Sequence, residues 1–431
     1  MSQKVRLGLL GMGTVGRGVY RLIEQNRALI EKRVGAEVAV AAIAVRDAKR
    51  DRGVKVPERI LTTDPGAVVR SPEVDVVVEL MGGYEPARTL VLDAIRAGKH
   101  VVTANKALLA EHGAEIRQAA YEGGVHLGFE ASVAGGIPVI KTLRESLAAN
   151  RILSIYGIIN GTSNYILTKM REEDRSFEDV LKEAQDAGYA EADPAFDVGG
   201  IDSAHKLAVL VNLAFGIDVR LKDIYTEGIT GISPVDIEFG REFGYTLKLL
   251  AIAKSGPGAI EARVHPTMVP DDYPIAQVGG VYNAVQIVGD AVGDLMLYGR
   301  GAGEMPTASA VAGDIVDICR SRVSGATVIP RPWVGGEGAI RPMEDISSLF
   351  YLRFMVEDKP GVLSQISGIL GRNNISIASV IQKGRDAHRT VPLVVMTHTA
   401  LERDVRRALA ETDTLSAVAS KTVLIRVEGE D

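Results

Sequence analysis

KVRLGLLGMGTVGRGVYRLIEQN, residues 4–26, determines the architecture of the first domain. The stretch predicts a short apolar strand, a glycine-rich loop and an amphipathic helix. Gly11, Gly13 and Gly16 fit the spacing G-x-G-x-x-G. The first glycine allows a tight turn, the second lets a pyrophosphate approach the backbone, and the third lets the helix pack closely on the strand. Because the N–H groups at the start of such a helix attract phosphates, the stretch predicts a dinucleotide-binding loop.

The end of the next strand bears on the choice of cofactor. AEVAVAAIAV, residues 36–45, predicts this strand, and Arg46 and Asp47 follow it. At this position a carboxylate binds the ribose 2′-hydroxyl of NAD, or an arginine binds the 2′-phosphate of NADP. Arg46 therefore favours NADP, while Asp47 leaves NAD open. A solvated charge pair in a loop is the alternative without a binding role.

Strands and helices continue to alternate as far as about residue 140. Apolar strands are predicted at 74–80, in HVVTAN and in VHLGFEASV, with the helices EPARTLVLDAIRAG and KALLAEHGAEIRQAAYEGG between them. This order predicts an α/β domain with a Rossmann-like, doubly wound parallel sheet. Ligands of such sheets lie beyond the carboxyl ends of the strands, so we expect Gly82 in ELMGG and Lys106 in TANK beside the cofactor. A solvated lysine at a helix start is the alternative for Lys106.

Composition narrows the classes of function. The chain has 431 residues and a formal net charge of −6. This length suits two or three domains, and the negative charge gives no reason to expect nucleic acid or an anionic membrane as a partner. No apolar run approaches the roughly 20 residues of a membrane span. The single cysteine, Cys319, cannot form an internal disulfide, so we expect a cytoplasmic protein.

A second group of functional residues is predicted in GYAEADPAFDVGGIDSAHK, residues 188–206. It holds four carboxylates and then one lysine, namely Glu191, Asp193, Asp197, Asp202 and Lys206. The apolar helix predicted at about 203–215 places Asp202 and Lys206 on one face, because they are four residues apart. An exposed pair of this kind would be only a surface contact. The crowded carboxylates, however, suit a substrate with an ammonium group, and the lysine suits proton transfer.

The other elements before the tail are predicted from periodicity and capping residues. LSIYGIING predicts a strand, and TSNYILTKMREE predicts a helix capped by Thr162 or Ser163. EFGYTLKLLAIAK, residues 242–254, predicts an amphipathic helix with Lys248 at its rim. TASAVAGDIVDICRSR predicts a helix capped by Thr307.

The tail is predicted to be a separate module. Residues 325–347 are rich in proline and glycine and predict a linker. Residues 348–431 predict the order strand, helix, strand, strand, helix, strand, which is that of a ferredoxin-like sandwich. The segment EDKPGVLSQIS, in which Pro360 and Gly361 open a helix, resembles an ACT domain, a regulatory module that binds amino acids. ACT modules usually pair, so the resemblance implies a homodimer or homotetramer. A structural dimerisation arm is the alternative.

Taken in order, seven segments over residues 7–314 resemble the homoserine dehydrogenase family. They are GLLGMGTVGRGV, TANKALLA, FEASVAGGIPVI, IINGTSNYIL, GYAEADPAFDVGGIDSAHKL, RVHPTM and GRGAGEMPTASAVAGD. The resemblance implies an NAD(P)-binding domain at 1–140 and a catalytic domain at 141–324, whose last helix packs on the first domain. The implied reaction interconverts L-homoserine and L-aspartate 4-semialdehyde with NADPH or NADH, on the route to threonine, methionine and isoleucine.

The resemblance also implies the roles of single residues. Lys206 protonates the developing alkoxide and Asp202 orients it, Glu191 binds the substrate amino group beside Asp197, and Lys106 lies next to cofactor and substrate. The remaining implied contacts are Gly11, Gly13, Thr14, Val15, Gly16 and Gly303 with the cofactor, and Glu130 with the main chain of Val133, Gly135 and Ile137 with sodium. Threonine is the implied ligand of the ACT domain. Two alternatives stay open, an oxidoreductase for another amino-acid aldehyde or keto acid, and a catalytically dead amino-acid sensor.

Overall fold

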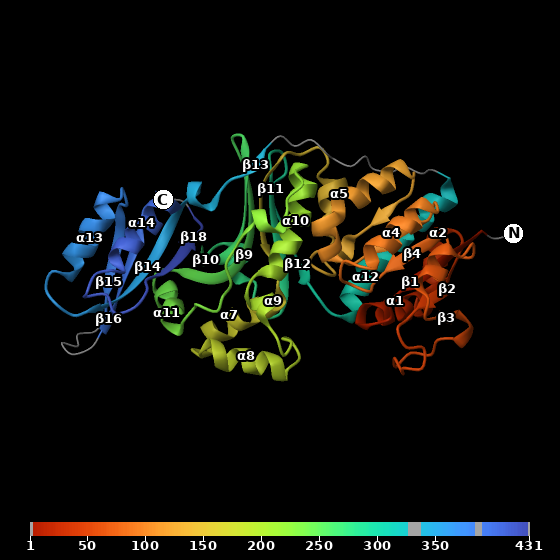
Figure 1. Ribbon diagram of the computed structural model, residues 1–431, viewed down its shortest axis with the longest axis horizontal. Helices are drawn as coiled ribbons and strands as arrows, with labels where there is room; N and C mark the ends of the chain where they lie inside the picture. Colours follow the sequence, from red (N-terminus) through yellow and green to blue (C-terminus); the bar gives the residue numbers. More distant parts are fainter. Residues whose placement is uncertain (1–2, 326–337, 384–389, 430–431) are drawn as a thin grey trace. The chain divides into compact units, whose positions relative to one another are not determined.

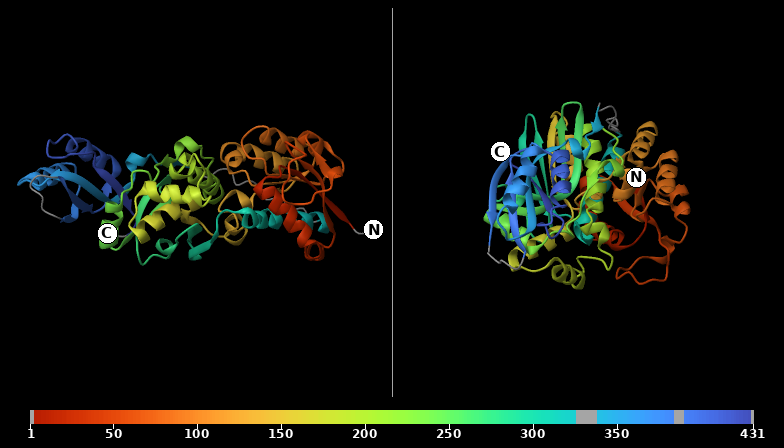
Figure 2. Two further views of the ribbon diagram at one scale, coloured as in Figure 1. Left: turned by 90° about the horizontal axis from the view of Figure 1, so that it is seen from below. Right: turned by 60° about the vertical axis from the view of Figure 1, so that its left-hand side comes forward.

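The computed structural model describes residues 3–325, 338–383 and 390–429, and Figures 1 and 2 show its helices and strands. Most of the predicted linker, residues 326–337, lies outside the described residues. The chain divides into two compact units. Unit 1 consists of Met1–Ile155, Asp202–Ile224 and Tyr282–Gly338, and unit 2 of Tyr156–Ile201, Tyr225–Val281 and Ala339–Asp431.

A six-stranded parallel sheet forms the centre of unit 1, in the order β3-β2-β1-β4-β5-β6. Its strands are β1 (Lys4–Leu10), β2 (Glu37–Ala44), β3 (Leu61–Thr62), β4 (Val76–Glu79), β5 (His100–Thr103) and β6 (Leu127–Gly128). Val76 and Val78 belong to one apolar cluster and Val77 to another, so each face of the sheet has its own core. The predicted Rossmann-like sheet is therefore confirmed.

Helices cover both faces of this sheet. They are α1 (Thr14–Gln25), α2 (Arg27–Val34), α3 (Pro65–Arg70), α4 (Ala87–Arg96), α5 (Lys106–Glu122) and α12 (Glu304–Ser324). The long helix α12 comes from much later in the chain, and its Val311 and Ile315 share a core cluster with Leu7 of β1. This helix therefore packs on the parallel sheet through apolar side chains. It is capped by Gly303, so the predicted cap at Thr307 is wrong by a turn.

The rest of unit 1 carries the residues with predicted catalytic and cation-binding roles. It includes η2 (Glu130–Ser132), α6 (Val139–Lys141), most of α10 (Ile201–Phe215), and the antiparallel hairpin of β11 (Tyr282–Gly289) and β12 (Gly293–Arg300). The strand predicted in VHLGFEASV is reduced to the two residues of β6, because the chain turns into η2 at Glu130. The strand β7 (Ile152–Ile158) leads from unit 1 into unit 2.

In unit 2, the predicted helix over 242–254 is wrong. The helix α11 (Pro234–Glu242) ends where that prediction begins, and the segment forms β9 (Tyr245–Gly256), which pairs antiparallel with β10 (Ala259–Pro270). Successive residues of β9 are buried on both faces, so its apolar residues run almost without a break instead of at helical spacing. Lys248 is accordingly only 3% exposed and not at a rim, and its Nζ donates to the Val278 carbonyl at 2.6 Å.

Three further helices of unit 2 precede the acidic segment or lie within it. They are α7 (Gly161–Glu173), α8 (Phe177–Asp186) and α9 (Ala195–Val198). The cap of α7 is Asn160, whose Oδ1 accepts the Ser163 N–H at 2.8 Å. The predicted caps Thr162 and Ser163 therefore lie inside the helix, because an asparagine earlier in the chain fills the position that favours a side-chain acceptor.

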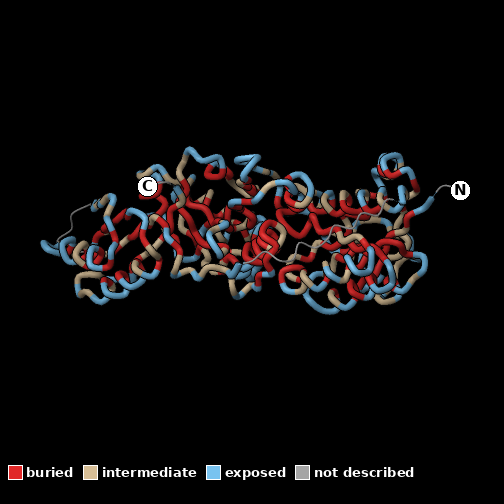
Figure 3. The backbone as a smooth tube through the Cα atoms, turned by 90° about the horizontal axis from the view of Figure 1, so that it is seen from above, coloured by how far each residue is buried: buried red, intermediate tan, exposed pale blue. Residues whose placement is uncertain are grey.

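The tail has the predicted ferredoxin-like order, with antiparallel strands in the order β18-β14-β16-β15. Its elements are β14 (Ser347–Glu357), α13 (Val362–Arg372), β15 (Ile377–Gln382), β16 (Thr390–Thr397), β17 (Ala400–Leu401), α14 (Glu402–Thr412) and β18 (Val423–Val427). Alternate residues of β14 join both helices in a core of their own, and Figure 3 shows buried stretches of backbone in this part of the chain. In addition, β18 pairs in parallel with β10, so the strands of the tail continue the sheet that contains β9 and β10.

Candidate functional site

The predicted lysine and carboxylate meet at the start of α10, and a second lysine joins them. Asp202, in the first turn of α10, is 2% exposed. Its Oδ2 accepts from Lys206 Nζ, one turn further on, at 2.7 Å. Its Oδ1 accepts from Lys106 Nζ at the start of α5. Two ammonium groups thus share one buried carboxylate, and we call these three residues the Lys–Asp–Lys cluster.

The electrostatics of the cluster keep Asp202 ionised. Burial alone would raise the pKa of Asp202, but the ammonium groups of Lys206 and Lys106 hold it well below its usual range. The Lys206 side chain is 11% exposed and that of Lys106 33%. With both lysines protonated the cluster carries a net positive charge, which stabilises negative charge that develops on a nearby oxygen. The arrangement therefore suits proton transfer to an alkoxide.

A buried polar network holds the loops that follow β4 and β5. Glu79, the last residue of β4, is fully buried; its carboxylate accepts from Thr103 Oγ1 at 2.6 Å and from the Gly82 N–H at 3.1 Å. Asn105 caps α5 and its Nδ2 donates to the Gly83 carbonyl at 2.7 Å. The network fixes both Gly82 and the start of α5, where Lys106 lies. The segments ELMGG and TANK were predicted beside the cofactor, but the contacts among Glu79, Thr103 and Asn105 were not, although polar residues that end apolar strands were a visible signal.

The glycine-rich loop has the geometry that the spacing predicted. Gly11 has a φ of +100°, and a Cβ there would lie 2.8 Å from the Leu80 carbonyl oxygen. A Cβ on Gly16 would lie 2.4 Å from the carbonyl oxygen of Gly11, whereas a Cβ on Gly13 would meet nothing within 4 Å. Thr14 and Val15 open α1, whose cap Gly13 offers no side-chain acceptor. The N–H groups of the first turn are therefore placed to bind a phosphate.

Two aspartates in the loop after β2 accept hydrogen bonds from main-chain N–H groups of the same loop. Arg46 and Asp47 are both exposed. The Asp47 carboxylate accepts the N–H of Lys49 at 2.9 Å, and the Asp51 carboxylate accepts the N–H of Gly53 at 2.8 Å. Each acid thus closes a short turn of the kind that aspartate favours. The carboxylate of Asp47 is engaged within the loop.

The other acids of the 188–206 segment lie in unit 2. Glu191 is exposed, and its main-chain carbonyl accepts from Gln185 Nε2 at 3.1 Å. Asp197, in α9, accepts from Asn160 Nδ2 at 2.8 Å and from Thr162 Oγ1 at 3.4 Å. Asp197 therefore also has a structural contact with the N-terminus of α7, where a helix dipole favours a carboxylate.

The segment implied to bind sodium is a buried loop. Glu130 is 4% exposed, and its two carboxylate oxygens accept the N–H groups of Ile140 and Lys141 at 2.8 and 2.9 Å. Among the described residues no group of three or more His, Cys, Asp or Glu could hold a metal. A cation here would need main-chain oxygens, which are ligands that hard cations accept. The loop carries such oxygens on the buried residues Glu130, Val133, Gly135 and Ile137.

This loop packs on the segment that leads into α12. A Cβ on Gly135 would lie 2.3 Å from the Gly301 carbonyl oxygen, and the Gly136 N–H donates to the Arg300 carbonyl at 3.1 Å. Gly303, with a φ of +116°, then caps α12. Asp314 of α12 accepts the Glu130 N–H at 2.8 Å, and burial raises the pKa of Asp314 to about 7. The loop and α12 are thus held together by close main-chain contacts.

Comparisons with known proteins show the family of the chain. Two family models match, "Homoserine dehydrogenase, NAD binding domain" over residues 11–130 and "Homoserine dehydrogenase" over 138–316, and an ACT domain model matches 350–416. A homoserine dehydrogenase of Pseudomonas aeruginosa is 48% identical over 98% of this chain and 99% of its own length. The crystal structure of a homoserine dehydrogenase from Thiobacillus denitrificans has a TM-score of 0.92 at 47% identity and covers 99% of this chain and 98% of its own.

A second solved structure bears on the cofactor. A hyperthermophilic archaeal homoserine dehydrogenase, solved in complex with NADPH, has a TM-score of 0.63 at 26% identity and covers 73% of this chain and 98% of its own. Across the part of this chain that the structure describes, no helix combines the length and apolar character needed to cross a membrane.

Proposed function

Because the chain belongs to the homoserine dehydrogenases, NAD(P)-dependent oxidoreductases that act on a CH–OH group, we propose that the Lys–Asp–Lys cluster is its proton-transfer site. The observation that carries the proposal is the buried Asp202 carboxylate, held between Lys206 and Lys106. A lysine that is fixed in this way can donate a proton in one direction of the reaction and accept it in the other.

The chemistry of the proposed step follows from these residues. When bound, the nicotinamide supplies the hydride that reduces the aldehyde carbon of L-aspartate 4-semialdehyde. Negative charge then develops on the aldehyde oxygen, and Lys206 protonates it to give the hydroxyl of L-homoserine. Asp202 fixes the direction of the Lys206 side chain, and Lys106 adds positive charge beside the cofactor. In homoserine oxidation Lys206 takes the same proton back.

We propose Glu191 as the group that binds the ammonium of the substrate. Its carboxylate is exposed, and an ammonium ligand pairs well with such a group. Asp197 has a weaker claim as a substrate ligand because it is bound to Asn160 and Thr162. We propose that it shapes the acidic segment in which Glu191 lies.

For the cofactor we propose a preference for NADP. Asp47 is occupied by the N–H of Lys49, which supports Arg46 as the residue that binds the 2′-phosphate. The proposed pyrophosphate contacts are Gly11, Gly13, Thr14, Val15 and Gly16, with Gly82 and Gly303 lining the cofactor. A monovalent cation, sodium, is proposed on the main chain of the 130–137 loop, where its role would be structural.

For the tail we propose amino-acid regulation with threonine as the ligand, and assembly into a homodimer or homotetramer through paired ACT domains. The ACT domain match supports this proposal. The decisive experiment is steady-state oxidation of L-homoserine with NADP and with NAD, each over a titration of threonine. Oxidation of another amino-acid alcohol in preference to homoserine would favour a different substrate, and a chain without turnover would favour an amino-acid sensor.

A further inference from the structure

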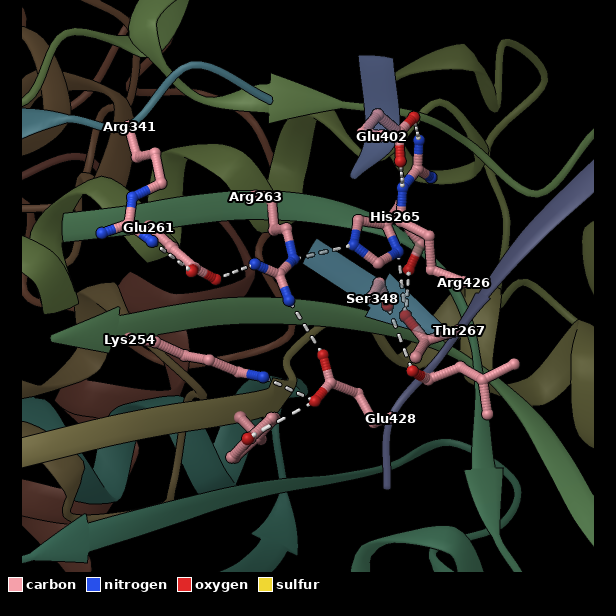
Figure 4. Close-up of polar contacts among 12 residues, drawn as sticks. Lys254, Glu261, Arg263, His265, Thr267, Arg341, Ser348, Glu402, Arg426 and Glu428 are labelled. Carbon is pink, nitrogen blue, oxygen red and sulfur yellow. Dashed lines mark hydrogen bonds and ion pairs between the residues drawn. The ribbon is translucent and has the colours of Figure 1, made fainter. Parts of the chain in front are cut away.

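The last strand of the tail contacts the β9–β10 hairpin of unit 2 through side chains as well as through main-chain pairing. β18 pairs with β10 at Arg426 opposite Thr267 and Val427 opposite Met268. Beyond the end of β18, Glu428 pairs with Lys254 of β9 at 2.7 Å and with Arg263 of β10 at 2.9 Å (Figure 4). Arg426 and Glu428 are two residues apart, so both connect the tail to the rest of unit 2 along one stretch of chain.

Arg426 joins a carboxylate of the tail to a carboxylate outside it. Its Nε and Nη2 donate to Glu402 of α14 at 3.0 and 2.6 Å (Figure 4). Its Nη1 donates to Glu227 at 3.0 Å, and Tyr225 Oη donates to the same carboxylate at 2.8 Å. The Arg426 side chain is 2% exposed, whereas that of Glu227 is 37% exposed. A guanidinium that stays charged when buried needs these partners.

Glu227 lies in the segment 225–229, which is held between β10 and α9. The Glu227 N–H donates to the Val264 carbonyl of β10 at 2.8 Å, and the Ile229 N–H donates to the Val198 carbonyl of α9 at 2.8 Å. A Cβ on Gly228 would lie 2.2 Å from that Val198 oxygen. The main chains of Gly228 and Val198 are therefore in close contact, with no room for a side chain on Gly228.

The same segment contacts the connection between α9 and α10, the helix that carries Asp202 and Lys206. Gly199 and Gly200 connect α9 to α10. A Cβ on Gly200 would lie 3.2 Å from Thr226 Cγ2 and 3.3 Å from the Glu227 carbonyl oxygen. α9 carries Asp197, and α10 begins at Ile201, directly before Asp202. If the segment 225–229 shifted, α9 on one side of these glycines and the start of α10 on the other side would therefore shift with it.

We propose that Arg426 is a positioning residue for the reaction, acting through Glu227. It holds the segment 225–229 against Val198 and Gly200, and so fixes the positions of α9 and of the first residues of α10. The inference rests on the proposed roles of Lys206 and Asp202. It makes the tail part of the catalytic apparatus even when no amino acid is bound to it, because small displacements of catalytic groups are costly.

The test uses Glu227→Ala, because a partly exposed carboxylate can be removed without loss of the fold and Arg426 keeps Glu402 as a partner. We expect kcat/KM for homoserine to fall about tenfold, the scale found for residues that act through a chain of contacts. The Kd for NADPH should not change, because the glycine-rich loop is built from other elements. Glu227→Gln, which keeps an oxygen acceptor for Arg426, should recover part of the activity that Glu227→Ala loses.

The matched control is Glu428→Gln, which weakens another contact of the tail, since the ion-pair partners of Glu428 are Lys254 and Arg263 and not residues of the segment 225–229. For this control we expect a lower Tm, because Lys254 and Arg263 lose a charged partner, with kcat/KM for homoserine kept within about twofold. Equal losses of kcat/KM in Glu227→Ala and Glu428→Gln would reduce Arg426 to a structural role, and an unchanged kcat/KM in Glu227→Ala would overturn the proposal. A wild-type chain that does not oxidise homoserine would instead contradict the proposed function.

Discussion

Replacing Lys206 by methionine tests the proposed proton donor with little disturbance of the fold. Methionine keeps an unbranched, flexible side chain but cannot transfer a proton. Breaking a buried ion pair usually costs about 3–5 kcal/mol, because one charge is left without a partner. Here Asp202 keeps Lys106 as a partner, so we expect the loss in the free energy of unfolding to stay below that range. The variant should therefore be folded at the temperature of the assay.

The kinetic effect should be much larger than the effect on stability. A positioned acid contributes about 10²- to 10⁴-fold, so we expect kcat of Lys206→Met to fall by at least ~100-fold. This corresponds to about 2.7 kcal/mol or more of transition-state stabilisation. Initial rates of homoserine oxidation, followed by nicotinamide absorbance, measure kcat, and a fluorescence titration measures the Kd for NADPH. That Kd should be nearly unchanged, because the glycine-rich loop does not involve Lys206.

Asp202→Asn is the contrasting variant. It removes the charge that both ammonium groups share, so both activity and Tm should fall. The pKa of Asp202 is held below its usual range, so its contribution to stability is present above the unfolded pKa of about 3.9 and is lost as the pH falls through the lower folded value. Asp202 therefore stays ionised at working pH.

If Lys206→Met keeps more than a tenth of the wild-type kcat, Lys206 is not the proton donor.

Three further predictions concern the substrate, the cofactor and the tail. Glu191→Ala should raise the KM for homoserine much more than the KM for the nicotinamide, and equal increases would remove Glu191 from the substrate site. Arg46→Ala should weaken NADPH binding more than NADH binding, as measured by Kd; an equal loss for both would favour Asp47 as the ribose contact. A chain that ends after residue 345 lacks β14 and β18, so it should have a lower Tm, a lower kcat/KM for homoserine and no response to threonine. Threonine inhibition that survives this truncation would place the effector site outside the tail.

Local patterns in the sequence predicted the parts of the site that lie close together along the chain. The glycine spacing at 11–16 indicated the loop and the start of α1, because Gly11 and Gly16 meet local steric requirements and Gly13 leaves open space beside the backbone. The four-residue spacing of Asp202 and Lys206 indicated their ion pair. The contact of Lys106 with Asp202 joins residues that are 96 positions apart, and no local pattern contains it. The segment 242–254 was assigned to a helix because a strand buried on both faces has no alternation to distinguish it.

The boundary of the tail shows what composition alone cannot reveal. The proline- and glycine-rich stretch marks where the covalent connection runs, and the tail does have its own apolar core. Whether two modules also share a sheet depends on the strand edges that they present to one another. In β10, Glu261, Arg263 and His265 alternate along one face, a pattern that normally indicates a solvated face. Arg263 and His265 are nevertheless each 1% exposed, and Glu428 of the tail supplies Arg263 with a countercharge. The alternating charged residues of β10 therefore belong to a buried contact with the tail, because Glu428, just beyond β18, supplies the opposite charge.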